Sequence, residues 1–286
     1  MPNVVLSLAG AAARILPTNV KMSLYRIPWL ARIVRRGLNR AAPQGLAEVV
    51  VAAGPIAGMR MSLDMQAEKE FWLGTYEPEL QAALLDLVKP GMVAYDVGAN
   101  IGYFTLLLAN RVGHSGRVYA FEALPANIKR LERNVALNNL GVCTQVVPAA
   151  VVDRSRPLDF MLGPSGRMGK VEGASGRHTV DYQEKIPIEG ISLDDFIAGK
   201  EHSAPDVIKM DIEGGEILAL PGMHTTLDRI KPLIFLELHG EEASQVAWKA
   251  LVGHGYRLSS LTQGYPEVTS LQSLDWKAYI LASPKS

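Results

Sequence analysis

The sequence predicts an α/β fold, in which a mostly parallel sheet is covered by helices on both faces. Two observations indicate this fold. From residue 92 onward, short apolar segments alternate with segments whose apolar residues recur at helical spacing. Four of the apolar segments also finish in an ionisable residue, and open α/β sheets bind their ligands beyond the carboxyl ends of the strands. A chain of 286 residues, 48% of them hydrophobic, is long enough to bury such a sheet on both sides.

The first residues predict a basic helical extension. Residues 1–43 have apolar residues near helical spacing, interrupted at Pro17 and Pro28. Residues 1–47 contain no acidic residue and seven basic ones: Arg14, Lys21, Arg26, Arg32, Arg35, Arg36 and Arg40. Such a segment can make peripheral contact with an anionic membrane surface, or it can pack on the main domain with its arginines in water. The whole chain has no net charge by count, so we expect no nucleic-acid partner.

A short hairpin and a helix lead into the main domain. Residues 47–53 and 59–63 predict two strands joined through Gly54-Pro55, and a helix that follows stops at Pro90-Gly91. We therefore divide the chain into an N-terminal extension with a hairpin, residues 1–70, and a main domain, residues 71–286.

The remaining elements follow from periodicity and turn residues. Strands are expected at residues 92–97, 117–122, 143–152, 207–211, 232–239, 256–261 and 276–282, and helices at residues 103–112, 127–140 and 241–253. The glycine- and serine-rich residues 163–178 predict a loop, either a mobile lid or a plain crossover.

The single cysteine, Cys143, lies in an apolar stretch and predicts a buried thiol. No segment reaches the length of a transmembrane helix, and we expect a cytoplasmic protein, with the inner membrane surface as the alternative location.

The turn after the first core strand has the composition of a nucleoside-binding loop. In Asp96-Val97-Gly98-Ala99-Asn100-Ile101-Gly102, Gly98 permits a tight turn and Gly102 lets the next helix begin close to the strand. Glu122 lies 20 residues beyond Gly102, at the end of the following strand. A carboxylate there can accept hydrogen bonds from both hydroxyls of a ribose, so the spacing predicts a nucleoside-containing cofactor.

The charge of this turn separates two cofactors. A dinucleotide such as NAD places its pyrophosphate over a helix amino end, usually on a G-x-G-x-x-G loop. Here the glycines are spaced G-x-x-x-G, and Asp96 would repel a phosphate but attract the ammonium group of a methionine moiety. Asn100 can hydrogen-bond the same amino-acid portion. The acidic turn therefore favours S-adenosylmethionine, a sulfonium compound without phosphate.

Several stretches resemble the FkbM-type S-adenosylmethionine-dependent methyltransferases. They are FWLGTYEPEL (71–80), YDVGANIGYFTLLLA (95–109), VYAFEALPANIKRLERNVALN (118–138), IKMDIEGGE (208–216) and LIFLELHG (233–240). The resemblance implies a Rossmann-like seven-stranded methyltransferase sheet, with cofactor contacts at Asp96, Gly98, Asn100, Gly102 and Glu122. The family often has a proline directly after the glutamate, where this chain has Ala123-Leu124-Pro125, which changes the local loop shape.

The acceptor side is expected at the ends of two further strands. A hydroxyl acceptor must lose its proton as the new bond forms. His239 is our candidate base because histidine titrates near neutral pH, and Glu237, two residues earlier on the same side of the strand, could orient it. The alternative is a structural histidine at the strand edge.

Asp211, Glu213 and Glu216 form a second centre of ionisable residues. They could hold a divalent cation such as magnesium. We prefer the alternative without a metal, in which Glu213 and Glu216 favour the amino end of the next helix and Asp211 binds the substrate or Lys209. The candidates for acceptor binding are Trp72, Tyr76, Lys209 and Glu213, although the two aromatic residues could equally pack the N-terminal extension against the sheet.

The sequence as a whole predicts an O-methyltransferase that uses S-adenosylmethionine. The resemblance implies a hydroxyl acceptor on a sugar, glycolipid or secondary metabolite. The positions at the strand ends make Asp211, Glu237 and His239 our candidate catalytic residues. Two other classes stay open. One is a nicotinamide-dependent oxidoreductase, and the other is a non-catalytic membrane-surface scaffold with a methyltransferase fold.

Overall fold

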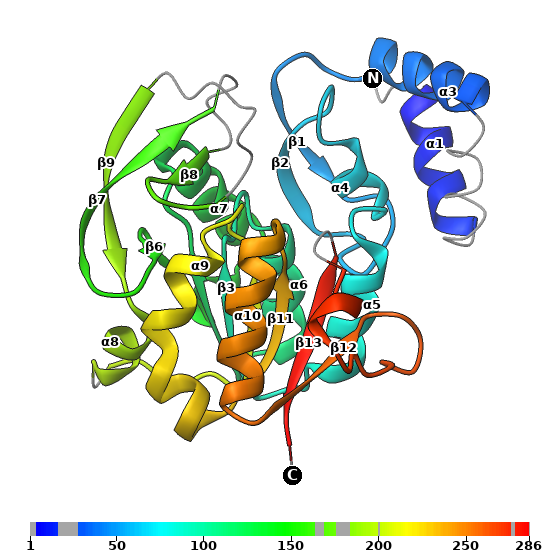
Figure 1. Ribbon diagram of the computed structural model, residues 1–286. Coiled ribbons are helices and arrows are strands. Elements are labelled where there is room, and N and C mark those ends of the chain that lie inside the picture. The colour runs from blue at the N-terminus through cyan, green and yellow to red at the C-terminus, as the bar shows by residue number, and fades with distance from the viewer. Residues whose placement is uncertain are drawn as a thin grey trace.

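A seven-stranded sheet forms the centre of the chain in the computed structural model (Figure 1), which describes residues 4–16, 28–163, 169–175, 184–199, 201–275 and 278–285. The strands are β3 (Val93–Val97), β4 (Arg117–Phe121), β5 (Thr144–Val147), β10 (Val207–Met210), β11 (Leu233–Glu237), β12 (Tyr256–Ser260) and β13 (Tyr279–Pro284). Their order is β12-β13-β11-β10-β3-β4-β5, and β13 alone runs antiparallel to its neighbours. The predicted mostly parallel α/β sheet is confirmed.

The strand order reverses beside β3. The chain moves outward from β3 through β4 to β5, then returns to place β10 against the other edge of β3. Ligands of open α/β sheets bind at such a reversal, outside the carboxyl ends of the strands. The sheet therefore places the turns after β3, β4 and β10 at one location.

Each face of the sheet has its own apolar core, because side chains alternate along a strand. Along β3, Ala94 belongs to one core, while Tyr95 and Val97 belong to the other. The first core contains α5 (Pro78–Leu87) and α6 (Tyr103–Val112). The second contains side chains of α8 (Leu193–Ala198), α9 (Glu216–Ala219) and α10 (Glu241–Gly253). The helices expected at 103–112 and 241–253 have the predicted bounds. After residue 77, the other helical elements of the described chain are α7 (Pro125–Leu137), η1 (Leu140–Val142), η2 (Leu220–Met223), η3 (Thr226–Ile230) and η4 (Leu271–Ser273).

A second, four-stranded sheet was not predicted. It contains β6 (Ala150–Val151), β7 (Arg156–Leu162), β8 (Gly169–Val171) and β9 (Glu184–Ile191), in the order β6-β9-β7-β8. The prediction of one strand over residues 143–152 was wrong. Pro148 has no N–H to donate to a strand ladder, and the chain leaves the main sheet there and enters the small one. Part of the predicted loop 163–178 is strand β8, and residues 164–168 and 176–183 lie outside the described part.

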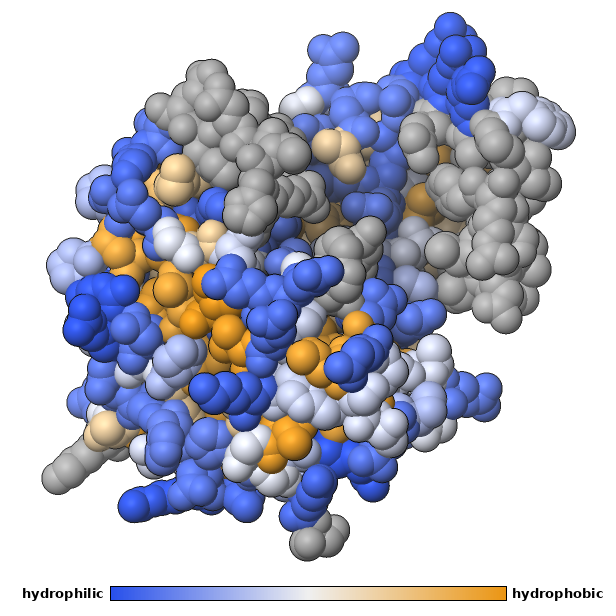
Figure 2. Space-filling view, in the orientation of Figure 1, coloured by the Kyte–Doolittle hydropathy of each residue, from blue (hydrophilic) through white to orange (hydrophobic). Residues whose placement is uncertain are grey.

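A third apolar cluster joins the small sheet to the main domain. It contains Leu124 from the start of α7, Phe160 from β7 and Ile188 from β9, with Leu218 of α9 packed against it. Figure 2 shows apolar residues gathered over this region, between the four-stranded sheet and α9. The small sheet is thus held close to the carboxyl ends of β3 and β4.

The described part of the N-terminal segment contributes three helices and a hairpin. These elements are α1 (Val4–Ile15), α3 (Pro28–Ala41), β1 (Leu46–Val50), β2 (Arg60–Asp64) and α4 (Lys69–Leu73). The antiparallel hairpin is as predicted, whereas the expected helix break at Pro17 lies outside the described residues. Ala13 and Leu38 are buried in the same core as α5 and α6. A boundary at residue 70 would fall within α4, and the division into residues 1–70 and 71–286 stays a prediction.

Among the described residues, no helix is long and apolar enough to cross a bilayer.

Candidate active site

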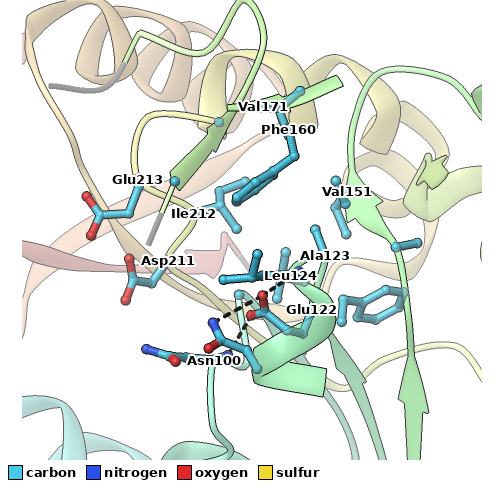
Figure 3. Close-up of a pocket in the computed structure, with 18 of the residues that line it drawn as sticks. Asn100, Glu122, Ala123, Leu124, Val151, Phe160, Val171, Asp211, Ile212 and Glu213 are labelled. Carbon is cyan, nitrogen blue, oxygen red and sulfur yellow. Dashed lines mark hydrogen bonds between the residues drawn. The ribbon is translucent and has the colours of Figure 1, made fainter. Parts of the chain in front are cut away.

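A pocket opens at the carboxyl edge of the sheet, where the strand order reverses (Figure 3). Its walls come from the turns after β3, β4 and β10 and from the small sheet. Figure 3 shows Glu122 and Asn100 together on one side of the pocket, and Asp211 and Glu213 together on another. The pocket therefore has two polar ends with different partners.

Glu122 is fixed in place by backbone donors. Its Oε2 accepts a hydrogen bond from the Asn100 amide at 2.8 Å, and its Oε1 accepts one from the Leu124 amide at 2.9 Å. The Nδ2 of Asn127 lies 3.4 Å from Oε1. Burial raises the pKa of Glu122, and these hydrogen bonds oppose that change. A carboxylate oxygen has two acceptor sites, so Oε2 retains capacity for a ligand hydroxyl.

The turn after β3 has the tight geometry predicted from its glycines. Gly98 has a φ of 78°, and a Cβ on it would lie 1.8 Å from the carbonyl oxygen of Asp211. Only glycine therefore lets this turn meet the turn after β10 so closely. Gly102 has a φ of 93°, and a Cβ there would lie 2.6 Å from Leu131 Cδ1 of α7. Because both positions are glycine, the turn after β3 can lie against the turn after β10 on one side and against α7 on the other.

Apolar side chains line the same pocket as Glu122. They are Leu124, Val151, Phe160, Val171 and Ile212. A carboxylate held at the edge of an apolar slot suits a nucleoside, whose ribose offers hydroxyl donors and whose base is flat and largely apolar on its faces. The residues present therefore fit the nucleoside portion of S-adenosylmethionine.

Asp96 is fully buried behind the turn, and it does not line the pocket. Its Oδ2 accepts a hydrogen bond from Thr105 Oγ1 at 2.6 Å, and its Oδ1 lies 3.3 Å from the ammonium of Lys209. Lys209 Nζ also donates to the carbonyl of Gly98 at 3.1 Å and lies 4.0 Å from Asp211. Burial lowers the pKa of Lys209, but Asp96 and Asp211 outweigh that effect and raise it. Lys209 is 3% exposed, so the structure corrects its predicted acceptor contact to a structural link beneath the site.

His239 lies among four carboxylates. Its Nδ1 is 3.0 Å from Oε1 of Glu216, which is fully buried at the first position of α9. Its Nε2 lies 3.7 Å from Asp211 Oδ1, and 3.8 Å from both Glu213 Oε2 and Glu237 Oε2. The structure thus brings together four of the residues predicted on the acceptor side, Asp211, Glu213, Glu237 and His239. It also shows that Glu216 is the residue that fixes the imidazole, a role the sequence prediction gave to Glu237.

The acids of this group shift each other's protonation. Burial and the adjacent Asp211 raise the pKa of Glu237 to about 9. Burial lowers the pKa of His239, but the hydrogen bond to Glu216 and the nearby carboxylates outweigh it and raise the pKa to about 9. The imidazole is therefore already protonated at neutral pH in this arrangement, which does not favour it as a base.

Tyr76 and Trp72, both predicted on the acceptor side, have different positions. Tyr76 lines the pocket, and its ring packs against Phe71 and Tyr103. Trp72 is buried away from the pocket, where its Nε1 donates to the carbonyl of Val50 at 3.0 Å. The prediction of acceptor contact for Trp72 is corrected, because the ring packs the hairpin against the domain.

The sequence analysis did not identify several residues of the site. Glu77 precedes Pro78 with a φ of 42°, a strained conformation for a non-glycine residue, and burial raises its pKa. Tyr279 lies opposite Glu237 in the β11–β13 pairing. Phe160 comes from the sheet that was not predicted. The Glu-Pro pair was the only local signal, because the other positions are set by long-range pairing.

The fold and the pocket define an α/β enzyme that binds a nucleoside cofactor at a strand-order reversal. Comparison with known families identifies it further. The family described as "Methyltransferase FkbM domain" matches residues 96–258, more than half of the chain. The chain belongs to the FkbM methyltransferase family and is an S-adenosylmethionine-dependent methyltransferase (EC 2.1.1.-). The nicotinamide-dependent and non-catalytic alternatives are thereby set aside.

Individual relatives are more distant. The chain is 26% identical over 187 residues to the hexuronic acid methyltransferase AglP of Haloferax volcanii, covering 64% of this chain and 72% of that protein. It is 28% identical over 197 residues to the 31-O-demethyl-FK506 methyltransferase FkbM of Streptomyces tacrolimicus, covering 59% and 74%. A crystal structure of methyltransferase FkbM from Methylobacillus flagellatus has 16% identity and a TM-score of 0.44, covering 90% of this chain and 60% of that chain.

Proposed function

We propose that the protein methylates a hydroxyl group of a sugar, a glycolipid or a secondary metabolite. The observation that carries the proposal is the carboxylate group around Asp211, which faces the same pocket as the nucleoside-binding Glu122. A hydroxyl acceptor must give up a proton, and this group offers acceptors for it. The names of the two relatives, a hexuronic acid methyltransferase and a 31-O-demethyl-FK506 methyltransferase, agree with a hydroxyl-bearing acceptor.

The cofactor side of the pocket is assigned to the turn after β3 and to Glu122. Glu122 binds the ribose, and Asn100 lines the pocket for the amino-acid portion of the cofactor. Gly98 lets the backbone approach the cofactor, and Gly102 packs the turn against α7. Asp96 acts one layer behind, where it holds Lys209 and so the shape of the turn. When bound, S-adenosylmethionine supplies an electrophilic methyl group on a sulfonium. The residues of the chain supply orientation, which accounts for much of the catalysis in a displacement of this kind.

The acceptor side is assigned to Asp211, Glu213 and Tyr76, which line the pocket. Asp211 faces the acceptor hydroxyl and is the group placed to take up its proton. Glu237 hydrogen-bonds the Asp211 carboxylate and His239 lies 3.7 Å from it, so both help to keep Asp211 in position. Their predicted catalytic role is therefore proposed as support for Asp211, not as direct proton abstraction by His239.

A membrane-surface contact is proposed for the N-terminal helices. Trp29 on α3 is 64% exposed, and Arg32, Arg36 and Arg40 of the same helix are exposed as well. Figure 2 shows strongly hydrophilic residues over the region of α3. Exposed aromatic and basic side chains on one short helix favour the interface of an anionic bilayer. This placement would suit a lipid-linked acceptor.

The acceptor class is tested by labelling. The purified protein is incubated with cellular extract and S-adenosylmethionine carrying a tritiated methyl group, and the products are separated into protein, glycan, lipid and small-molecule fractions. We expect the label in a glycan, glycolipid or small molecule, as an alkali-stable ether. Asp211→Asn should abolish that label. Label confined to protein, or to a nitrogen atom, would contradict the proposal.

A further inference from the structure

Three side chains at the acceptor end of the pocket are arranged as ligands around one point. Asp211, Glu237 and His239 each offer one ligand atom, and these atoms all lie within 4.8 Å of one another. Asp211 directly follows β10, Glu237 ends the adjacent β11, and His239 lies two residues further on. Because neighbouring parallel strands present these positions side by side, the sheet itself sets their spacing.

The imidazole of His239 is oriented in the way a metal ligand requires. Its Nδ1 faces the buried Glu216 at 3.0 Å, which leaves Nε2 directed at Asp211 (3.7 Å) and Glu237 (3.8 Å). These two separations are too long for hydrogen bonds. Two ligands of one cation, each about 2.1 Å from it, lie roughly 3–4 Å apart. Metal-binding histidines usually give their other ring N–H to a carboxylate, as His239 does to Glu216.

An enclosed carboxylate oxygen beside this group lacks a hydrogen-bond donor. Among the described residues, Glu216 Oε2 has no hydrogen-bond partner. Glu216 is itself fully buried. The ammonium of Lys209 lies 3.3 Å from Asp96 and 4.0 Å from Asp211. Its positive charge therefore balances the charge of Asp96 better than that of Asp211. Around His239 the carboxylates of Asp211, Glu213, Glu216 and Glu237 outnumber the positive charges of His239 and Lys209. A bound cation that displaces the His239 proton would balance this excess of acids.

We propose that Asp211, Glu237 and His239 bind a divalent cation, with Glu216 holding the histidine from behind. Two carboxylates and one imidazole suit a first-row ion such as Mn²⁺ or Zn²⁺ better than Mg²⁺ or Ca²⁺, which prefer oxygen ligands alone. The arrangement revises the sequence expectation, in which a metal was disfavoured and Asp211, Glu213 and Glu216 were the ligands considered. Next to the pocket, the cation would bind an acceptor oxygen and make its hydroxyl more acidic, a role that rests on the proposed function.

The experiment measures metal binding directly. Full-length protein is treated with a chelator, desalted and titrated with Mn²⁺, and the loss of the free-Mn²⁺ electron paramagnetic resonance signal is recorded. We expect one site per chain, with competition by Zn²⁺. Asp211→Asn and Glu237→Gln should each weaken binding at least tenfold, and Glu216→Gln about tenfold to a hundredfold. Glu242→Gln, at an exposed acid on α10, should leave the affinity unchanged.

Binding of S-adenosylhomocysteine, measured by calorimetry, shows that each variant is folded. The absence of a Mn²⁺ site, or a site that Asp211→Asn and Glu237→Gln leave unaltered in folded protein, would overturn the proposal. These outcomes are separate from the acceptor question. Hydroxyl methylation without metal binding would remove this inference alone, whereas metal binding with methylation of nitrogen would remove the proposed function alone.

Discussion

We expect cofactor recognition to depend most on Glu122. Its two oxygens are already held by the amides of Asn100 and Leu124, so the carboxylate is oriented before a ligand arrives. This arrangement lowers the entropic cost of binding a ribose. The neighbouring Gly98 keeps the turn after β10 close enough for the cofactor and acceptor ends to share one pocket.

Glu122→Gln is expected to weaken S-adenosylhomocysteine binding roughly tenfold to a hundredfold. The amide retains the shape of the side chain but loses the charge, and a hydrogen bond to a charged group contributes about 1.5–3 kcal/mol. Isothermal titration measures the change. Glu132→Gln, at an exposed position of α7, is the control and should bind like the unaltered protein. Equal affinities for both variants would remove Glu122 from the cofactor site.

The affinity for S-adenosylhomocysteine should also fall as the pH is lowered. Burial raises the pKa of Glu122, so its carboxylate takes up a proton at a higher pH than an exposed glutamate does. A group with a raised pKa in the folded state does not destabilise the fold on acidification, because the folded protein binds that proton more readily than the unfolded chain. Titrations between about pH 8 and pH 5 should show the loss in the unaltered protein. The Glu122→Gln protein should lack that component, and parallel curves would contradict this explanation.

Local sequence patterns identified the residues of the cofactor turn but not all of their contacts. Glycine spacing and the position of a strand end depend on local sequence, so Gly98, Gly102 and Glu122 could be placed. The pairing of Asp96 with Lys209 and of Glu216 with His239 joins different strands and turns. Trp72 shows the same limit, because an aromatic residue near a pocket can equally fill a core.

At the scale of elements, helix α7 is linked to the N-terminal hairpin and the segment after it by a largely enclosed ion pair. Arg130 donates to both carboxylate oxygens of Glu68, at 2.9 and 2.5 Å, and to the carbonyl of Ser62 at 2.9 Å. The side chains of Arg130 and Glu68 are only 13% and 14% exposed. One turn further along the helix, Arg133 pairs with Glu48, but these side chains are 57% and 35% exposed.

Arg130→Ala should therefore destabilise the protein by about 2–3 kcal/mol, because it leaves Glu68 enclosed without its partner. The expected decrease in thermal melting temperature is about 5–10 °C. Arg133→Ala should change stability by less than about 1 kcal/mol, since exposed pairs contribute little. Differential scanning calorimetry of the two variants makes the comparison. Equal decreases would show that α7 is not anchored through Arg130.

Elements were predictable where one periodicity covered the whole segment. Helices α6 and α10 and the strands of the main sheet have such patterns. The small sheet does not, because β7 and β9 combine proline and charged residues with partial exposure. Its strands are stabilised by pairing with each other, and β7 and β9 are far apart in sequence. Pro148, which sends the chain from one sheet to the other, was included in a single predicted strand.

At the scale of the whole molecule, no described residue of α1 or α3 lines the pocket proposed for the cofactor. The pocket lies at the carboxyl edge, while α1 and α3 pack beside the hairpin at the upper right in Figure 1. This arrangement permits a membrane contact that does not involve the catalytic groups. The proposed membrane contact can therefore be tested by substitutions in α3 that leave the pocket unchanged.

The protein is expected to co-sediment with phosphatidylglycerol vesicles at low salt but not with phosphatidylcholine vesicles. Each basic residue near an anionic surface contributes about 1 kcal/mol, so replacing Arg32, Arg36 and Arg40 by Gln should weaken binding roughly a hundredfold. The matched control replaces three exposed lysines of the main domain, Lys89, Lys231 and Lys249. High salt should release the unaltered protein. Equal binding by both triple variants would contradict a contact through α3.

The most direct test of the account is a crystal structure with S-adenosylhomocysteine. We predict the nucleoside in the pocket at the strand-order reversal, with its ribose hydroxyls donating to the Glu122 carboxylate and its base against Phe160 and Leu124. The sulfur should point toward Asp211. A ligand bound elsewhere, with the Glu122 carboxylate in contact only with Asn100, Leu124 and Asn127, would contradict the assignment of this pocket.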